Sequence, residues 1–272
     1  MSNENNRQSW DKLSEYYQLS TSISLDDIHY APYSPGEKEL NVIGDVKGLD
    51  VIELGCGGGQ IAIVLAKMGA KNVAALDISE QQLNHARLLA SREKANITFL
   101  HGDMENLSSL QNASFDLVVS VHAISYVSNI ENVLSEISRI LRLNGRVVLC
   151  TIHPLQYVLW EALEEDSIKK VQSYFGSEPS TWDWIDNTKT PIATFSDRAH
   201  RYEEFVNGLL KNGLILERVI EPRGYTIEEL KTIDLEEVAY HNKRIDEQFT
   251  RINQIIPFSI IYVAKKIEID QN

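Results

Sequence analysis

The sequence has few cysteines and no long apolar run. The two cysteines in 272 residues are Cys56 and Cys150, which form neither a disulfide framework nor a metal-binding spacing, as is typical of a reducing compartment. The start, MSNENNRQSW, is polar and lacks the apolar segment of a signal peptide, and no stretch approaches the roughly 20 apolar residues of a membrane span. We therefore expect a soluble, cytoplasmic protein without a membrane partner.

Positive charge is also scarce. Lys and Arg together number 26 against 39 Asp and Glu, which gives a net charge of −13. Because proteins hold phosphate backbones mainly through basic patches, this balance argues against a nucleic-acid partner. No cluster of His, Cys, Asp and Glu has a metal-binding spacing, so we expect no metal. The length favours one large α/β domain with embellishments, although two small domains would also fit.

The stretch VIELGCGGGQ (residues 51–60) combines a short apolar run with a glycine-dense turn, and a helical pattern follows from Ile61. Strand, glycine loop and helix form the first unit of nucleotide-type α/β folds, in which the helix N-terminus offers free N–H groups to a ligand. A dinucleotide fingerprint that begins at Gly55 and Gly57 would place a third glycine at position 60, which is Gln60. An acid, Glu53, stands at the strand tip, where it suits a cationic ligand better than a pyrophosphate.

Glu53 with Gly55, Gly57 and Gly59 resembles the first motif of class I S-adenosylmethionine-dependent methyltransferases. The resemblance implies an α/β Rossmann-like fold, with a seven-stranded mostly parallel sheet, helices on both faces and an antiparallel terminal hairpin. It also implies S-adenosylmethionine as cofactor and S-adenosylhomocysteine as product. The alternatives are a tight strand–helix turn in another α/β protein and, within that group, an NAD-linked dehydrogenase.

Two further acids follow predicted strands. Asp77 follows the strand Asn72–Leu76 and lies 18 residues after Gly59, near the roughly 20 expected for an acid on a ribose. Asp103 follows the strand Ile97–Leu100, and the resemblance implies that it binds the adenine amino group while Met104 packs on the ring. The remaining residues that we assign to the cofactor are Cys56, Gln60, Ile78, Gln82, Ser120 and Val121. Gln82 also fits a capping box with Ser79.

The chain divides into four parts of one domain: an N-terminal helical cap (1–45), a cofactor-binding core (46–155), an insertion or lid (156–200) and the rest of the core sheet (201–272). Tyr16, Tyr30 and Tyr33 of the cap are either lid residues over the cofactor or aromatics that pin the cap to the core. The insertion holds three of the four tryptophans, which either build the acceptor site or form a small core of their own.

The pattern also predicts several local features beyond these motifs. A short amphipathic helix is expected over Trp10–Tyr17, and another from Glu37 to Ile43. The helix that Asn129 caps is expected to end at Asn144-Gly145. Near the end of the chain, a helical region is expected from Thr226 to about Asn253, followed by a strand over Ile255–Ala264.

Three histidines near predicted strand ends or the lid, His122, His153 and His200, are candidate general bases, and His29 of the cap is a further one. Each could equally serve a structural role. The fourth strand ends in SVHAISYV rather than in the Asn/Asp-Pro-Pro-aromatic signature of amino-directed nucleic-acid methyltransferases.

The sequence looks closest to the bacterial ubiquinone/menaquinone-type and secondary-metabolite branch. We therefore expect methyl transfer to an O, N or activated C of a small molecule. The alternatives are a methyltransferase of RNA or protein and a regulatory protein that binds the cofactor without catalysis. The sequence leaves open whether the protein is a monomer or a homodimer.

Overall fold

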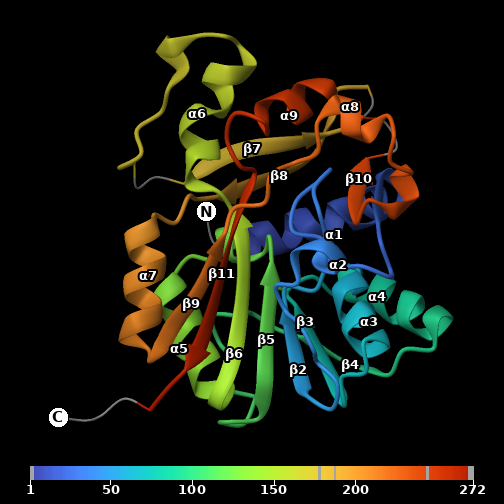
Figure 1. Cartoon of the computed structure of the whole chain (residues 1–272), viewed down its shortest axis with the longest axis vertical. Coiled ribbons are helices and arrows are strands. Elements are labelled where there is room, and N and C mark those ends of the chain that lie inside the picture. Colours follow the sequence, from blue (N-terminus) through green and yellow to red (C-terminus); the bar gives the residue numbers. More distant parts are fainter. Residues whose placement is uncertain (1–2, 177–178, 187, 243–244, 269–272) are drawn as a thin grey trace.

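The computed structural model describes residues 3–176, 179–186, 188–242 and 245–268. Its centre is a seven-stranded sheet in the order β4-β3-β2-β5-β6-β11-β9 (Figure 1). The strands are β2 (Asp50–Leu54), β3 (Asn72–Asp77), β4 (Ile97–His101), β5 (Phe115–Val121), β6 (Leu141–Ile152), β9 (Leu214–Ile220) and β11 (Ser259–Lys266). Neighbouring strands from β4 to β6 pair parallel, whereas β11 pairs antiparallel with both β6 and β9. This confirms the predicted fold class.

Helices cover both faces of the sheet because the inner strands are apolar on both sides. Ile52 and Leu54 of β2 face α5 (Ile130–Ile140) and α7 (Tyr202–Lys211) in one core cluster. Val51, on the opposite side of the same strand, packs in a second cluster with α3 (Gln60–Lys67) and with Leu83 of α4 (Glu80–Glu93). The period-2 alternation of a strand thus divides the core into two layers.

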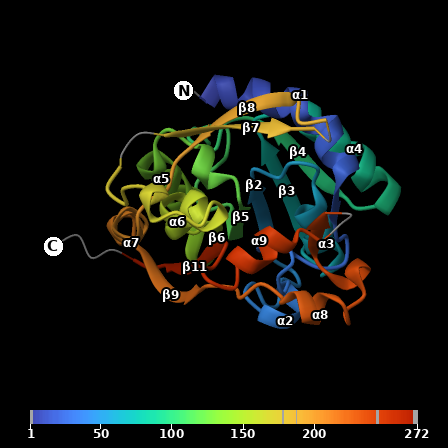
Figure 2. The same ribbon diagram turned by 90° about the horizontal axis from the view of Figure 1, so that it is seen from above.

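The remaining elements gather at the carboxyl ends of the parallel strands (Figures 1 and 2). Helix α1 runs beside the antiparallel hairpin of β7 and β8 and alongside α4, as Figure 2 shows from above. These additional elements are α1 (Asn3–Ser20), β1 (Thr21–Ile23), α2 (Glu37–Leu40), α6 (Pro154–Glu164), β7 (Ser180–Ile185), β8 (Pro191–Asp197), α8 (Ile227–Leu230), β10 (Tyr240–Asn242) and α9 (Glu247–Ile252). Together they close the end of the sheet at which α/β proteins bind ligands.

The structure corrects four sequence-based boundaries. Helix α1 begins at Asn3 rather than Trp10, α2 ends at Leu40 rather than Ile43, and the last strand begins at Ser259 rather than Ile255. Helix α5 ends at Ile140, so Asn144, although its φ is 66°, lies within β6 and not at a helix end.

The helical region predicted from Thr226 to about Asn253 is also wrong. In the described part of this region, the helices are α8, α9 and a single 3₁₀ turn over Leu235–Glu237, and β10 lies between α8 and α9. The helical pattern misled because β10 pairs with β1 near the start of the chain, and sequence periodicity cannot show such a long-range partner.

Candidate active site

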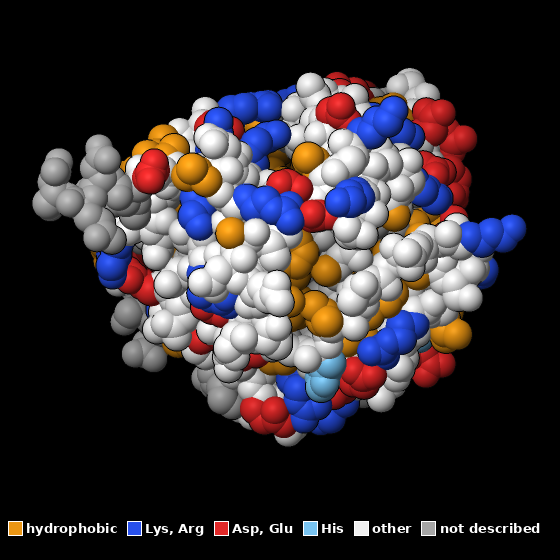
Figure 3. Space-filling view, turned by 90° about the horizontal axis from the view of Figure 1, so that it is seen from below, with side chains coloured by type: hydrophobic (Ala, Val, Ile, Leu, Met, Phe, Trp, Pro, Cys, Tyr) orange, Lys and Arg blue, Asp and Glu red, His pale blue; other side chains and the backbone are white. Residues whose placement is uncertain are grey.

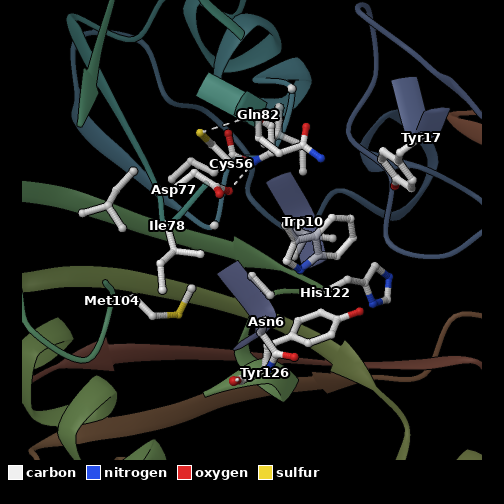
Figure 4. A pocket seen from close by; sticks show the side chains of 18 of the residues that line it. Asn6, Trp10, Tyr17, Cys56, Asp77, Ile78, Gln82, Met104, His122 and Tyr126 are labelled. Atoms are coloured by element: carbon white, nitrogen blue, oxygen red, sulfur yellow. Dashed lines mark hydrogen bonds between the residues drawn. The ribbon is translucent and has the colours of Figure 1, made fainter. Parts of the chain in front are cut away.

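A cavity of about 280 Å³ lies where the carboxyl ends of β2, β3, β4 and β5 meet α1 and the β7–β8 hairpin (Figure 4). It is lined by thirteen residues that the sequence singled out for the cofactor or as bases: His29, Glu53, Gly55, Cys56, Gly57, Gln60, Asp77, Ile78, Gln82, Asp103, Met104, Val121 and His122. The parallel sheet brings these segments together because the strand ends share one edge.

The glycine loop follows β2 and adopts backbone angles that favour glycine. Gly55 and Gly57 have φ of 76° and 50°, in the left-handed region. A Cβ on Gly55 would lie 2.2 Å from the Cβ of Ala123, whereas a Cβ on Gly57 would meet nothing within 4 Å. Gly55 therefore allows the loop to pack on the tip of β5, and Gly57 presents bare backbone to the cavity.

Asp77, the last residue of β3, is buried and holds the loop. Its Oδ2 accepts a hydrogen bond from the Gly57 N–H at 2.7 Å, and its Oδ1 accepts one from the Ser79 N–H at 2.8 Å. Burial raises the pKa of the Asp77 carboxyl, while these two hydrogen bonds oppose the rise. Each oxygen retains a second lone pair, so the carboxylate can still accept hydrogen bonds from ligand hydroxyls.

Glu53 carries an unsatisfied oxygen at the cavity. The side chain is 3% exposed, and its Oε2 has no hydrogen-bond partner in the described part of the chain. Burial raises the pKa of Glu53 well above its usual value; the negative charge of Asp77 adds to this rise, and a hydrogen bond with the Ala62 backbone opposes it. A buried carboxyl oxygen without a hydrogen-bond partner is costly, so this position favours a cationic or hydrogen-donating ligand group.

Asp103 and Met104 follow β4 and line the same cavity. Asp103 Oδ1 accepts a hydrogen bond from the Glu105 N–H, and Asp103 Oδ2 accepts one from the side-chain amide of Asn3 at 2.7 Å. Met104 and Ile78 both line the cavity (Figure 4), and apolar side chains of this kind would suit a flat ring.

Helix α1 lies over all three strand tips and contacts each through a polar side chain. Besides Asn3 on Asp103, Asp11 accepts a hydrogen bond from the Ser79 hydroxyl at 2.7 Å. The Gln18 side chain accepts a hydrogen bond from the Gln60 amide at 2.8 Å and donates one to the Gln82 side chain at 3.0 Å. These two hydrogen bonds cross over the glycine loop. The helix is thus the roof of the cavity.

The opposite half of the cavity is aromatic. Trp10 packs edge to face on Tyr17 and Tyr126, with ring centroids 5.7 and 5.6 Å apart, and Tyr17 packs the same way on Trp184 at 5.5 Å. These rings come from α1, the tip of β5 and the hairpin, so all three elements share one wall. Trp182 of the hairpin also lines the cavity.

His122 stands at the tip of β5 with a φ of 56°, unusual for a non-glycine residue. Its Nε2 lies 2.9 Å from the Tyr30 carbonyl oxygen. Burial lowers the pKa of His122 to about 4, so the ring is neutral near pH 7. His29 lines the same region, and burial lowers its pKa to about 3.

Four residues assigned to the cofactor lie outside the cavity lining. Tyr16 packs with Leu13 and Phe195 beneath α1. Tyr30 is fully buried, and its hydroxyl donates a hydrogen bond to Glu37 at 2.6 Å. Tyr30 is therefore connected to the cavity lining only through its backbone carbonyl, which lies 2.9 Å from His122 Nε2.

Gly59 and Ser120 also lie outside the lining, for packing reasons. A Cβ on Gly59 would come within 2.9 Å of Ala86, so this glycine permits α3 to pack on α4. The Ser120 hydroxyl donates to the Leu54 carbonyl at 2.8 Å within the sheet. Sequence spacing located the right loop and strand but not which way each residue faces.

The structure does not bring the other two candidate bases to the cavity. His153 caps α6, where its Nε2 lies 2.9 Å from Glu221 Oε1 and 2.6 Å from the Tyr202 hydroxyl. His200 is buried with its Nε2 3.2 Å from the Ile124 carbonyl, and burial lowers its pKa to about 4. Both histidines connect elements of the fold.

The sequence missed several lining residues. Among those not singled out are Asn3, Asn6, Trp10, Tyr17, Tyr126, Tyr240 and Phe258. The available signal was the helical spacing of Asn3, Asn6, Trp10 and Tyr17, which share one face of α1. Of the tryptophans in the insertion, Trp182 and Trp184 reach the cavity, whereas Trp160 packs on Phe249 with ring centroids 5.8 Å apart.

The described part of the cavity is lined without strongly basic side chains. No residue of the described cavity lining is Lys or Arg. Lys, Arg, Asp and Glu are intermixed on the face at the amino ends of the strands (Figure 3). Within the described ranges, no three His, Cys, Asp or Glu side chains cluster as a metal site, and no helix has both the length and the apolarity to cross a membrane.

Comparison with known proteins agrees with this geometry. Residues 52–149 match the family model described as a methyltransferase domain. This segment is a methyltransferase domain with the class I fold. An S-adenosylmethionine dependent methyltransferase from Mesorhizobium loti has a TM-score of 0.57 at 22% identity, covering 83% of this chain and 94% of that one.

Two sequence relatives each match about half of this chain. The uncharacterized methyltransferase YbaJ of Bacillus subtilis (strain 168) is 38% identical over 127 residues, which are 47% of this chain and 49% of the relative. The ubiquinone biosynthesis O-methyltransferase of Rickettsia canadensis (strain McKiel) is 30% identical over 125 residues, 45% and 52% respectively. The chain therefore spans about half the length of the relatives it matches.

Proposed function

We propose that this chain binds S-adenosylmethionine and transfers its methyl group to a small molecule. The observation that carries the proposal is the Glu53 carboxyl, one oxygen of which has no described partner, beside the glycine loop and Asp77. A ligand that carries an ammonium group and a ribose satisfies both acids at once, whereas a pyrophosphate offers them neither a positive charge nor a hydrogen-bond donor. Ubiquinone biosynthesis O-methyltransferases among the relatives support a small acceptor.

We assign each part of the cofactor to residues of the cavity lining. Glu53 and the Gly57 backbone would hold the methionyl end, and Asp77 would hold the ribose hydroxyls. Asp103 would hold the adenine amino group, with Ile78 and Met104 against the ring. When bound, the sulfonium supplies an activated methyl group for in-line displacement.

The chain's own contribution to transfer is positioning and exclusion of water. Orientation of donor and acceptor is worth roughly 7–11 kcal/mol in aligned systems. Helix α1 and the β7–β8 hairpin close the cavity above the strand tips, which supports this role. The absence of Lys and Arg from the described cavity lining argues against an RNA acceptor.

Calorimetry and methyl transfer test the proposal in two steps. Titration with S-adenosylhomocysteine should show one site, and radiolabelled methyl from S-adenosylmethionine should appear on small acceptors. Binding without transfer to any acceptor would favour the regulatory alternative. Transfer to RNA or protein in place of small molecules would contradict the small-acceptor part of the proposal.

A further inference from the structure

The first described residue of helix α1, Asn3, is hydrogen-bonded to an acid of the cavity. Its side-chain amide donates to Asp103 Oδ2 at 2.7 Å, and both residues line the cavity. The other carboxylate oxygen, Asp103 Oδ1, accepts a hydrogen bond from the Glu105 backbone N–H at 2.9 Å. A ligand group that approaches Oδ2 from the cavity therefore meets the Asn3 side chain there.

The Asn3 amide offers the same kinds of hydrogen-bonding group as the edge of adenine. Its nitrogen donates to Asp103, and its oxygen Oδ1 accepts a hydrogen bond from the Ser128 hydroxyl at 2.5 Å. In adenine, the exocyclic amino group donates while a neighbouring ring nitrogen accepts. Asn3 thus makes with Asp103 the hydrogen bond that the proposed function gives to the adenine amino group.

Asn3 can give up Asp103 and still keep two partners. The same amide nitrogen, which carries two hydrogens, also donates to Glu105 Oε1 at 2.8 Å, and the Ser128 hydroxyl donates to Asn3 Oδ1. Glu105 Oε1 is itself fixed by the backbone N–H groups of Ser128 and Asn129, at 2.5 and 3.1 Å. These contacts do not involve Asp103, so they remain when another donor takes Oδ2.

Helix α1 is also held elsewhere, so a change at Asn3 stays local. The Asn6 side chain exchanges two hydrogen bonds with the Ser196 backbone of β8, at 2.7 and 3.0 Å. The Ser9 hydroxyl donates to the Thr194 carbonyl of the same strand at 2.5 Å. Figure 2 shows α1 running beside this hairpin. These contacts dock the helix independently of its first residue.

Resting on the proposed function, we propose that Asn3 is an autoinhibitory contact, which occupies Asp103 Oδ2 until the adenine amino group of the cofactor replaces it. Binding then exchanges one hydrogen bond to a carboxylate for another, so the amino group adds little to the affinity of the wild-type protein. Only the fraction of molecules in which Asn3 has left Asp103 is ready for the cofactor, and the apparent dissociation constant rises accordingly. Asn3 thereby sets the cofactor concentration at which the site fills.

Replacement of Asn3 by Ala tests the proposal, because it removes the competitor and leaves a strong helix former in α1. We expect S-adenosylhomocysteine to bind Asn3→Ala about three- to tenfold more tightly than the wild type, the worth of one such hydrogen bond. Stopped-flow fluorescence of Trp10, which lines the cavity, should show the gain in the association rate constant. The dissociation rate constant should stay the same, because neither bound protein contains the contact between Asn3 and Asp103.

Unchanged or weaker binding of S-adenosylhomocysteine by Asn3→Ala would overturn the autoinhibitory role alone. Failure of both proteins to bind S-adenosylhomocysteine would instead overturn the proposed function, on which that role rests. The control Asn5→Ala makes the same change at an exposed position of α1 and should bind as the wild type does.

A matched ligand separates competition at Asp103 from a general loosening of the helix. The deamino analogue of S-adenosylhomocysteine, with purine in place of adenine, has no amino group to donate to Asp103. It should therefore bind the wild type and Asn3→Ala with equal affinity. An equal gain for both ligands in Asn3→Ala would show that the substitution loosens α1 and does not free Asp103, which would overturn the proposal.

Discussion

Asp77 Oδ2 accepts a hydrogen bond from the Gly57 backbone at 2.7 Å, so one carboxylate both shapes the glycine loop and faces the cavity. The acid at the end of β3 and the loop after β2 are therefore one unit. Binding of a ribose to Asp77 and approach of a ligand to the Gly57 backbone should be coupled for the same reason.

Replacement of Asp77 by Ala should weaken binding of S-adenosylhomocysteine by about 1–3 kcal/mol, because charge-assisted hydrogen bonds are lost. Titration calorimetry measures the change. Asp45→Ala, at an exposed position, is the control and should bind as the wild type does. Equal affinities for the two variants would count against the ribose assignment.

Gly57→Ala and Gly48→Ala separate backbone strain from ligand approach. Both glycines have positive φ, 50° and 79°, and neither would place a Cβ within 4 Å of a protein atom. Each substitution should cost about 1–2 kcal/mol of unfolding free energy, measured with urea. Only Gly57→Ala should also lose affinity for S-adenosylhomocysteine, so a similar loss in Gly48→Ala would contradict the assignment of the loop.

Glu53 should release a proton when the cofactor binds. Burial raises its pKa well above the usual value, and a ligand ammonium would lower it again. Calorimetry at a series of pH values, in buffers of different ionisation enthalpy, should detect proton release in the wild type and none in Glu53→Gln. Identical proton counts in the two proteins would show that Glu53 does not meet the ligand's charge.

Gln18 should slow the release of the product. It bridges Gln60 and Gln82 over the glycine loop, so Gln18→Ala removes two hydrogen bonds from the roof at about 0.5–1.5 kcal/mol each. Stopped-flow measurements should show faster dissociation of S-adenosylhomocysteine. Gln8→Ala, on the exposed side of α1, is the control. Unchanged dissociation in Gln18→Ala would show that α1 does not retain the ligand.

Stability should fall as the pH drops below about 6.5. Burial lowers the pKa of His200 from 6.5 to about 4 in the folded protein, so the unfolded chain binds more protons between these values. This contribution is complete above pH 6.5 and is lost as the pH falls to about 4, amounting to at most about 3 kcal/mol. Urea unfolding of His200→Asn across this range should show a shallower pH dependence, and an unchanged slope would contradict the burial argument.

Glu53, Asp77 and Asp103 could be placed at one edge from the sequence because the carboxyl ends of parallel strands meet there. Helix α1, which covers the cavity, could not be predicted as well. Helix α1 begins seven residues before the predicted start, and its cavity face runs through Asn3, Asn6, Trp10 and Tyr17 rather than Tyr16.

The histidines show a second limit of the sequence. His122 and His153 both follow strand ends, yet the first lines the cavity and the second bonds to Glu221 and Tyr202. Whether such a histidine faces the cavity depends on the side chains that other elements place against it. Its position at a strand end does not show which side chains these are. The same holds for β10, whose partner β1 lies more than 200 residues earlier in the chain.

Cofactor binding at the glycine loop is best tested by calorimetric titration of the purified chain with S-adenosylhomocysteine and, separately, with NAD. We predict saturable one-to-one binding of S-adenosylhomocysteine and no measurable heat of binding with NAD, since Glu53 and Gln60 stand where a dinucleotide needs space and no acid. Binding of NAD with no response to S-adenosylhomocysteine would contradict it.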